Sequence, residues 1–310
     1  MNNLINEDIT IKDLVKYLVY TFLFIFISGA SFLLLYELIN EKDIFLSLNI
    51  FSNKLFIKII LLIIIYMILD SLRLYYVLRS IDVKVSFEYI IKLSFIYIFI
   101  SNVTPFATGG GFAQIYFLHK KGVSIGDASS ASLIRTFLAF MFFIIIAPII
   151  LILDSKIYNL FPKDISISYL SIFSIIYIIV IYIFYNIIRK PELIEKYIHK
   201  CLKFLNKKKI LSDEKFNRYI KKTEKEIEKL STNINNFLIS NKKYVFLSII
   251  FTLLFLLSFF YFSVILIKDL NPNISSLKII LAQIIITFIM YMSPTPGSTG
   301  VAEGGFTLLF

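Results

Sequence analysis

Long apolar stretches make up most of this chain and limit what it can fold into. Each is about 20 residues or longer, which as a helix matches the roughly 30 Å hydrocarbon thickness of a bilayer. With 58% hydrophobic residues and a mean hydropathy of +0.80, the chain is not an ordinary soluble domain. We therefore expect an all-α, polytopic integral membrane protein. Plain membrane spans are predicted at 14–36, 55–78, 128–153, 169–188 and 244–267.

Two further apolar stretches, 89–118 and 275–310, are interrupted by nearly the same string of residues. The string is TPFATG at 104–109 and TPGSTG at 295–300. The segments around the two strings hold seven of the ten glycines and three of the seven prolines, the residues least compatible with a helix interior. Paired helix breaks in two halves of a membrane protein are typical of transporters that bind their substrate near the bilayer midplane.

The distribution of charge predicts the orientation in the membrane. Residues 189–243 contain 16 Lys or Arg and 7 Asp or Glu, so this linker carries nine of the eleven net positive charges and is expected in the cytoplasm. The acidic 37–54 loop is expected outside, which places Arg79 and Lys84 inside. The N-terminus is then cytoplasmic, and the 89–118 stretch begins and ends on the cytoplasmic side.

The charge of the 189–243 linker has two interpretations. It either sets the topology of a solvated helical hairpin or also attracts anionic lipid headgroups, at about 1 kcal/mol per basic residue near the surface. Nucleic acid is not an expected partner, because a charged linker beside membrane spans needs none.

An apolar element of about 30 residues that returns to its starting side must be a re-entrant hairpin. For 89–118 we predict one half-helix to about Ile100, a turn over 102–111 and a second half-helix from Phe112. Non-helical backbone at this depth is tolerated only where it is buried in protein or lines a wet cavity.

The same pattern recurs with opposite orientation in the second half of the chain. We predict two re-entrant helical hairpins in an inverted-topology repeat, the architecture of many alternating-access transporters. In a single domain over 1–310, the first repeat covers 14–118, 128–153 is a connecting span, and the second repeat covers 169–310, interrupted by the basic linker. Because the last apolar run is unfinished at Phe310, we expect the second hairpin to continue beyond it.

Four charged residues lie within apolar stretches, where each costs about 2.5 to 3.5 kcal/mol to insert. Asp70 and Arg73 are three residues apart, so either they pair, Arg73 extends to the interface, or both contact substrate. The fork-shaped guanidinium of Arg135 suits a lipid phosphate or a carboxylate such as Glu303. Glu303 is either stabilised by a helix dipole, a proton or cation site, or the partner of Arg135.

The hairpin tips offer binding groups of another kind. Backbone N–H groups at 109–111 and 297–300 are predicted at the N-termini of half-helices, where an anion is favoured. With equal weight, the glycines only permit a tight buried turn. The candidate substrate-binding residues are therefore Asp70, Arg73, Asn102, Thr104, Pro105, Thr108, Gly109, Gly110, Arg135, Pro296, Gly297, Ser298, Thr299, Gly300 and Glu303.

Motifs for catalysis, for a metal or for a cofactor are not found in the sequence. His119 and His199 are assigned to basic cytoplasmic stretches, away from any Ser, Cys or carboxylate cluster. We therefore expect no catalytic residues, no metal and no cofactor, and an enzymatic activity has no support.

The chain resembles the transmembrane flippase-like domain of the lysylphosphatidylglycerol synthase family. The more specific motif is PTPGSTGVAEG at 294–304, and the resemblance covers most of 60–145 and 285–310. In the first half it rests on Arg73, Arg79, Ser86, Asn102, Pro105, Gly109, Gly110 and Arg135. The resemblance implies movement of lipids with modified or phosphate-bearing headgroups between leaflets.

Two positions depart from the pattern of that family. Gln114 stands where the family often has Arg, and Ile134 where it often has Glu. If those charges contact the headgroup, the ligand here differs from lysylphosphatidylglycerol. Because no soluble synthase domain is present in these residues, aminoacyl transfer is not implied.

We therefore expect a multi-pass protein of the bacterial inner membrane that translocates a lipid or polyprenyl-linked headgroup, with Asn102, Arg135 and Glu303 as its main binding residues. Its expected partners are membrane lipids with anionic or phosphate-bearing headgroups, and a homo-oligomer is left open. Two alternatives also stay open: a lipid-binding membrane subunit of a lipid-modifying transferase, and an ion-coupled carrier of small solutes.

Overall fold

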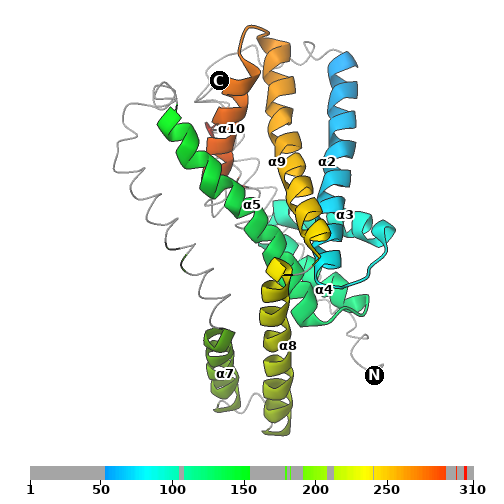
Figure 1. Cartoon of the computed structure of the whole chain (residues 1–310), viewed down its shortest axis with the longest axis vertical. Helices are drawn as coiled ribbons and strands as arrows, with labels where there is room; N and C mark the ends of the chain where they lie inside the picture. The colour runs from blue at the N-terminus through cyan, green and yellow to red at the C-terminus, as the bar shows by residue number, and fades with distance from the viewer. Residues whose placement is uncertain are drawn as a thin grey trace, which may run out of the picture.

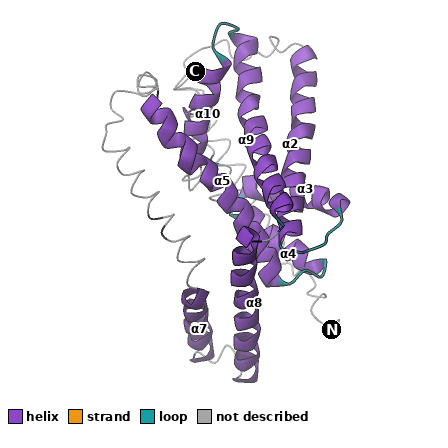
Figure 2. Ribbon diagram, viewed as in Figure 1, coloured by secondary structure: helices purple, strands orange, loops and turns teal. Residues whose placement is uncertain are grey.

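In a computed structural model, the regular secondary structure of the described residues is all helical, so the all-α prediction is confirmed (Figures 1 and 2). It describes residues 53–104, 108–153, 179, 182, 191–207, 213–239, 241–290, 298, 304 and 305. The helices are α2 (Asn53–Ser80), α3 (Phe87–Val103), α4 (Gly109–Lys120), α5 (Ile125–Leu153), α7 (Pro191–Lys207), α8 (Asp213–Ile239), α9 (Lys242–Leu270) and α10 (Ser276–Met290). The predicted span 14–36 lies outside these residues, as does 169–188 apart from Ile179 and Tyr182.

Helices α2 and α9 lie side by side and antiparallel (Figure 1). They contain 28 and 29 residues, and in the described part of the chain they are the two helices long and apolar enough to cross a membrane. Aromatic rings join them, with the Tyr66 and Phe255 centroids 4.8 Å apart. The outer face of α2 exposes large apolar side chains such as Phe56 and Leu61, which suits contact with lipid. Helices α5 and α10 pack against α9.

Helices α3 and α4 form a hairpin that packs against α2 and α5. Their 17 and 12 residues span about 26 and 18 Å, less than the hydrocarbon thickness of a bilayer. The turn between them is shorter than the predicted 102–111. The Thr104 hydroxyl closes it by donating to the Ile100 carbonyl (2.8 Å) and accepting from the Gly109 N–H (3.0 Å).

Close contact between α3 and α4 explains one of the glycines at this turn. A Cβ on Gly110 would lie 1.9 Å from the Ser101 hydroxyl oxygen and 2.7 Å from the Tyr97 carbonyl oxygen. Because no side chain fits in that space, Gly110 has a packing role in the hairpin, whether or not its N–H also binds substrate.

The basic linker folds into the helices α7 and α8, which project from one end of the bundle (Figure 1). Both carry an apolar stripe, so they are not solvated all round. On α8 the stripe includes Ile227, Ile234 and Phe237, which are buried, and the last two pack in the same core cluster as Ala128 and Ala131 of α5.

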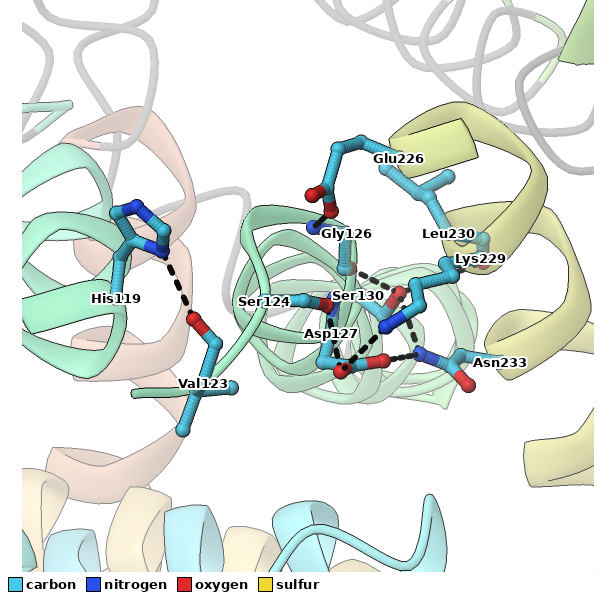
Figure 3. Close-up of polar contacts among 10 residues, drawn as sticks. All are labelled: His119, Val123, Ser124, Gly126, Asp127, Ser130, Glu226, Lys229, Leu230 and Asn233. Carbon is cyan, nitrogen blue, oxygen red and sulfur yellow. Dashed lines mark hydrogen bonds and ion pairs between the residues drawn. The ribbon is translucent and has the colours of Figure 1, made fainter. Parts of the chain in front are cut away.

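Polar contacts hold α8 to the N-terminus of α5 (Figure 3). Ser124 caps α5: its hydroxyl accepts from the Asp127 N–H (3.1 Å) and donates to the Asp127 carboxylate (2.6 Å). From α8, Glu226 accepts the Gly126 N–H (2.6 Å). A carboxylate is favoured there because the first N–H groups of a helix have no partner within the helix.

Asp127 has two further neighbours in this junction. Asn233 donates to it (2.7 Å) and the Lys229 ammonium lies 3.6 Å away, both from α8 (Figure 3). Burial raises the pKa of the Asp127 carboxyl, but the hydrogen bonds from Ser124 and Asn233 and the charge of Lys229 outweigh it and lower the pKa below its ordinary value.

Replacing Gly126 with Ala should separate α8 from α5. The new Cβ would lie 2.5 Å from the Glu226 carbonyl oxygen and 2.9 Å from the Lys229 Cβ. We expect a loss of about 1 to 3 kcal/mol from overpacking, measured by unfolding in detergent, and faster tryptic cleavage within 189–243. Gly111→Ala is the matched control, because its Cβ would meet only the Ser132 hydroxyl at 3.4 Å. Equal protease resistance of both variants would contradict this packing.

The junction should also weaken in acid. A carboxyl whose pKa is lowered by folding contributes stability above its unfolded pKa of about 3.9 and loses it as the pH falls through the folded pKa. Wild type should therefore exceed Asp127→Asn in thermal stability at pH 7, and the difference should shrink below about pH 4. In an Asn233→Ala background, Asp127→Asn should cause a smaller loss of thermal stability at pH 7. Asn236→Ala, at an exposed site on α8, should leave that loss unchanged. A difference independent of pH would argue against the lowered pKa.

Candidate functional site

Three charged side chains are buried together where α2 and α5 meet. Asp70 and Arg73 of α2 are 0% and 4% exposed, and Arg135 of α5 is 1% exposed. The Arg135 guanidinium donates through Nη2 to the Asp70 carboxylate, and Arg73 Nη2 lies 3.6 Å from the same oxygen. Of the alternatives that the sequence leaves open, the structure shows the pairing of Asp70 with Arg73, and Arg73 is buried rather than extended to the interface.

Side chains from three more helices complete this group, which we call the Asp70 cluster. Gln114 of α4 is fully buried and accepts a hydrogen bond from Arg135 Nη1 (2.6 Å). The Arg135 guanidinium lies 3.9 Å from the ring centroid of Tyr97 on α3, and that of Arg73 lies 4.2 Å from the ring centroid of Phe255 on α9. The Asp70 cluster therefore consists of Asp70, Arg73, Tyr97, Gln114, Arg135 and Phe255.

The Asp70 cluster has hydrogen-bonding groups that the described residues leave unpaired. The guanidinium groups of Arg73 and Arg135 share one carboxylate oxygen of Asp70. Two donors, Arg135 Nε and Gln114 Nε2, and one acceptor, Asp70 Oδ2, are buried and have no hydrogen-bond partner among the residues that the structure describes. Because unpaired buried donors cost about 1 to 3 kcal/mol each, this arrangement favours an anion that accepts from them.

Helix geometry explains why these side chains point inward. Asp70 and Arg73 are one turn apart on the α2 face that also buries Met67 and Leu74. On α5, Arg135 follows Ala128 and Ala131 at helical spacing, and these small residues allow the neighbouring helices close to the α5 backbone. Cation–π contacts then offset part of the cost of burying the two guanidinium groups.

Of the hairpin candidates, Gly110 adjoins the Asp70 cluster, because a Cβ there would lie 2.7 Å from the Tyr97 carbonyl oxygen. Asn102 is exposed near the end of α3, and Thr104, Thr108, Gly109 and Gly110 form the turn and the start of α4. Ser298 has a φ of 58° and donates to the Met290 carbonyl (2.8 Å). The candidates outside the described residues are Pro105, Pro296, Gly297, Thr299, Gly300 and Glu303.

The pairing of Arg135 with Glu303 stays a prediction. The carboxylate that the structure places on Arg135 is Asp70, 65 residues earlier in the chain. Sequence reasoning also missed the contact with Gln114, which had been noted only as a departure from a family pattern. The signal available in the sequence was a polar glutamine within the apolar stretch 89–118.

A second polar feature lies at the end of the bundle next to α8. A groove of about 570 Å³ runs between the α2–α3 loop, the α4–α5 loop and α8. Its walls include three lysines and a single carboxylate: Lys84, Lys121, Lys229 and Asp127. The groove is therefore positive on balance, which suits an anionic headgroup at the surface of a membrane.

Comparison with known proteins agrees with this picture of a helical membrane protein. A family described as the lysylphosphatidylglycerol synthase TM region matches residues 14–310, which include the whole Asp70 cluster. A "UPF0104 membrane protein" of Archaeoglobus fulgidus is 26% identical over 245 residues, which is 79% of this chain and 72% of that relative. No solved structure matches the chain.

A double-mutant cycle should detect the Asp70–Arg135 pair. Asp70→Leu leaves two buried guanidinium groups and should cost about 3 to 5 kcal/mol of unfolding free energy in detergent. Adding Arg135→Met should restore part of that loss, with a coupling of about 0.5 to 3 kcal/mol. The control is Lys92→Gln, in an exposed pair with Glu88, which should leave stability unchanged. If the losses of Asp70→Leu and Arg135→Met, each measured alone, add up to the loss of the double variant, the pair is not coupled.

Proposed function

The chain belongs to the family of the lysylphosphatidylglycerol synthase transmembrane region, and on that premise we propose that it moves a lipid between the two leaflets of the cell membrane. The substrate is a lipid with a phosphate-bearing or polyprenyl-linked headgroup. The observation that carries the proposal is the buried Asp70 cluster, in which the Arg135 and Gln114 side chains each have an unpaired donor among the described residues. Ionisable groups held at this depth mark substrate pathways in membrane proteins.

The chemistry of the cluster suits exchange between two anions. A headgroup phosphate would accept from Arg135 and from the Gln114 amide, whose Nε2 donor has no partner among the described residues. Asp70 would then keep its ion pair with Arg73. Because one anion replaces another on Arg135, the buried guanidinium is never left without a counter-charge, which limits the cost of each exchange.

The surrounding helices suit a path from the cytoplasmic leaflet to the cluster. The hairpin of α3 and α4 is too short to cross the bilayer, which supports a re-entrant element. The lysines of the groove beside α8 would collect headgroups at the cytoplasmic surface. In this proposal the 275–310 stretch forms the second, oppositely oriented hairpin, with Pro296 and Gly300 at its tip and Glu303 in the first turn of the returning half-helix. The N-terminus and the basic linker then face the cytoplasm of a bacterial cell.

The test is lipid movement by the purified protein in proteoliposomes that contain fluorescent phospholipids. Wild type should expose inner-leaflet lipid to an external quencher, and Arg135→Gln should slow this by about tenfold or more, because a charge-assisted hydrogen bond contributes about 1.5 to 3 kcal/mol. Arg135→Lys keeps the charge but loses the fork, so its rate should lie between the two. The matched control is Lys92→Gln at the exposed pair.

Two outcomes would replace the proposal with one of its rivals. Lipid that co-purifies with the protein, but is not moved by it, would indicate a lipid-binding subunit of a transferase. Uptake of a small solute without bound lipid would indicate an ion-coupled carrier. Mass spectrometry of the purified sample, combined with the quenching assay, separates the three functions.

A further inference from the structure

Two carboxylates and an imidazole meet between α7 and α8, far from the Asp70 cluster in the sequence. Glu195 and His199 are four residues apart on α7 and so share a face, and Glu224 comes from α8. His199 Nε2 lies 4.0 Å from a Glu195 oxygen and 3.6 Å from a Glu224 oxygen. One ligand atom from each of the three residues lies within 4.8 Å of the others.

These distances fit a shared ion better than hydrogen bonds. Both distances are longer than the 2.7 to 3.2 Å that an N–H···O bond requires, and His199 Nε2 is buried with no hydrogen-bond partner in the part of the chain that the structure describes. Around a tetrahedral ion with bonds of about 2.0 to 2.2 Å, neighbouring ligand atoms lie about 3.3 to 3.5 Å apart. The distance to Glu224 is near that value, and a small rotation of the Glu195 side chain brings its oxygen into range.

We propose that Glu195, His199 and Glu224 bind a divalent metal ion, with Zn²⁺ as the best match. An imidazole with two carboxylates is a ligand set that Zn²⁺ accepts, and the two negative charges balance the ion. The side chains are 31% to 45% exposed, so the ion can enter and water can take the fourth position.

The bound ion holds α7 against α8 in the cytoplasmic hairpin. Ligands come from both helices, so the ion links two elements that are otherwise joined through 208–212 and by their apolar stripes. Glu224 is two residues before Glu226, which receives the N–H of Gly126 at the start of α5. The metal therefore stabilises the hairpin that docks on α5, and this role does not depend on lipid movement.

The arrangement corrects one interpretation of the sequence. His199 was placed in a basic stretch away from any carboxylate cluster, whereas in the structure it lies between two glutamates. The Glu195–His199 spacing on one helix was visible in the sequence. The third residue, Glu224, comes from a different helix and is brought close only by the packing of α8 on α7.

Metal titration of the full chain in detergent tests the proposal, with a purification tag that contains no histidine. Wild type should bind one Zn²⁺, and Co²⁺ in its place should give the visible absorption bands of a low-coordinate site. His199→Gln and Glu224→Gln should each weaken Zn²⁺ binding by more than about tenfold, since loss of even an outer-shell partner costs about 10- to 100-fold. Zn²⁺ should raise the melting temperature of wild type but not of His199→Gln.

The controls keep the same residue types outside the cluster. His119→Gln alters the histidine that contacts the Val123 carbonyl, and Glu228→Gln alters an exposed glutamate one turn after Glu224. Both should bind Zn²⁺ as wild type does. Equal binding by wild type, His199→Gln and Glu224→Gln would overturn the proposal, as would a loss in Glu228→Gln as large as that in Glu224→Gln. Circular dichroism in EDTA establishes that each variant is folded.

Discussion

The ion pair between Asp70 and Arg135 is the interaction on which the arrangement of the helices depends. Two buried opposite charges attract each other strongly, but either one alone is costly, so α2 and α5 are held in the one register that brings them together. Arg73, Gln114, Tyr97 and Phe255 then surround the pair from four helices. A buried ion pair contributes little net stability because its charges lose their hydration. The functional proposal therefore rests on this site.

Helix α5 joins this site to the hairpin of α7 and α8. Its first turn is held by α8, through Glu226 on the Gly126 N–H and through the contacts of Asp127. Arg135 lies nine residues further along, about 14 Å on the same continuous helix. The basic linker is therefore more than a topological marker, since α8 fixes the N-terminal end of the helix that carries Arg135.

Particular elements show how far sequence reasoning reached. The spans predicted at 55–78, 128–153 and 244–267 correspond to α2, α5 and α9 within about three residues at each end, because hydropathy depends on local composition. The turn predicted over 102–111 was too long. Thr104 closes the end of α3, and Gly109 to Gly111 form the first turn of α4. Glycine is suited to this helical turn because α4 packs closely against α3 there.

The amino-acid sequence alone determined helices that suit a membrane, the location of the charge and the break between α3 and α4, and it placed Asp70 and Arg73 one turn apart on α2. Each follows from neighbours along the chain, through hydropathy or the helical repeat. Tertiary packing alone brought Asp70 and Gln114 to Arg135, and Glu224 to His199. These partners lie 21 to 65 residues apart and come from different helices. Which of them meet depends on how each helix is rotated and placed against the next, and the periodicity of a single helix carries no information about its neighbour.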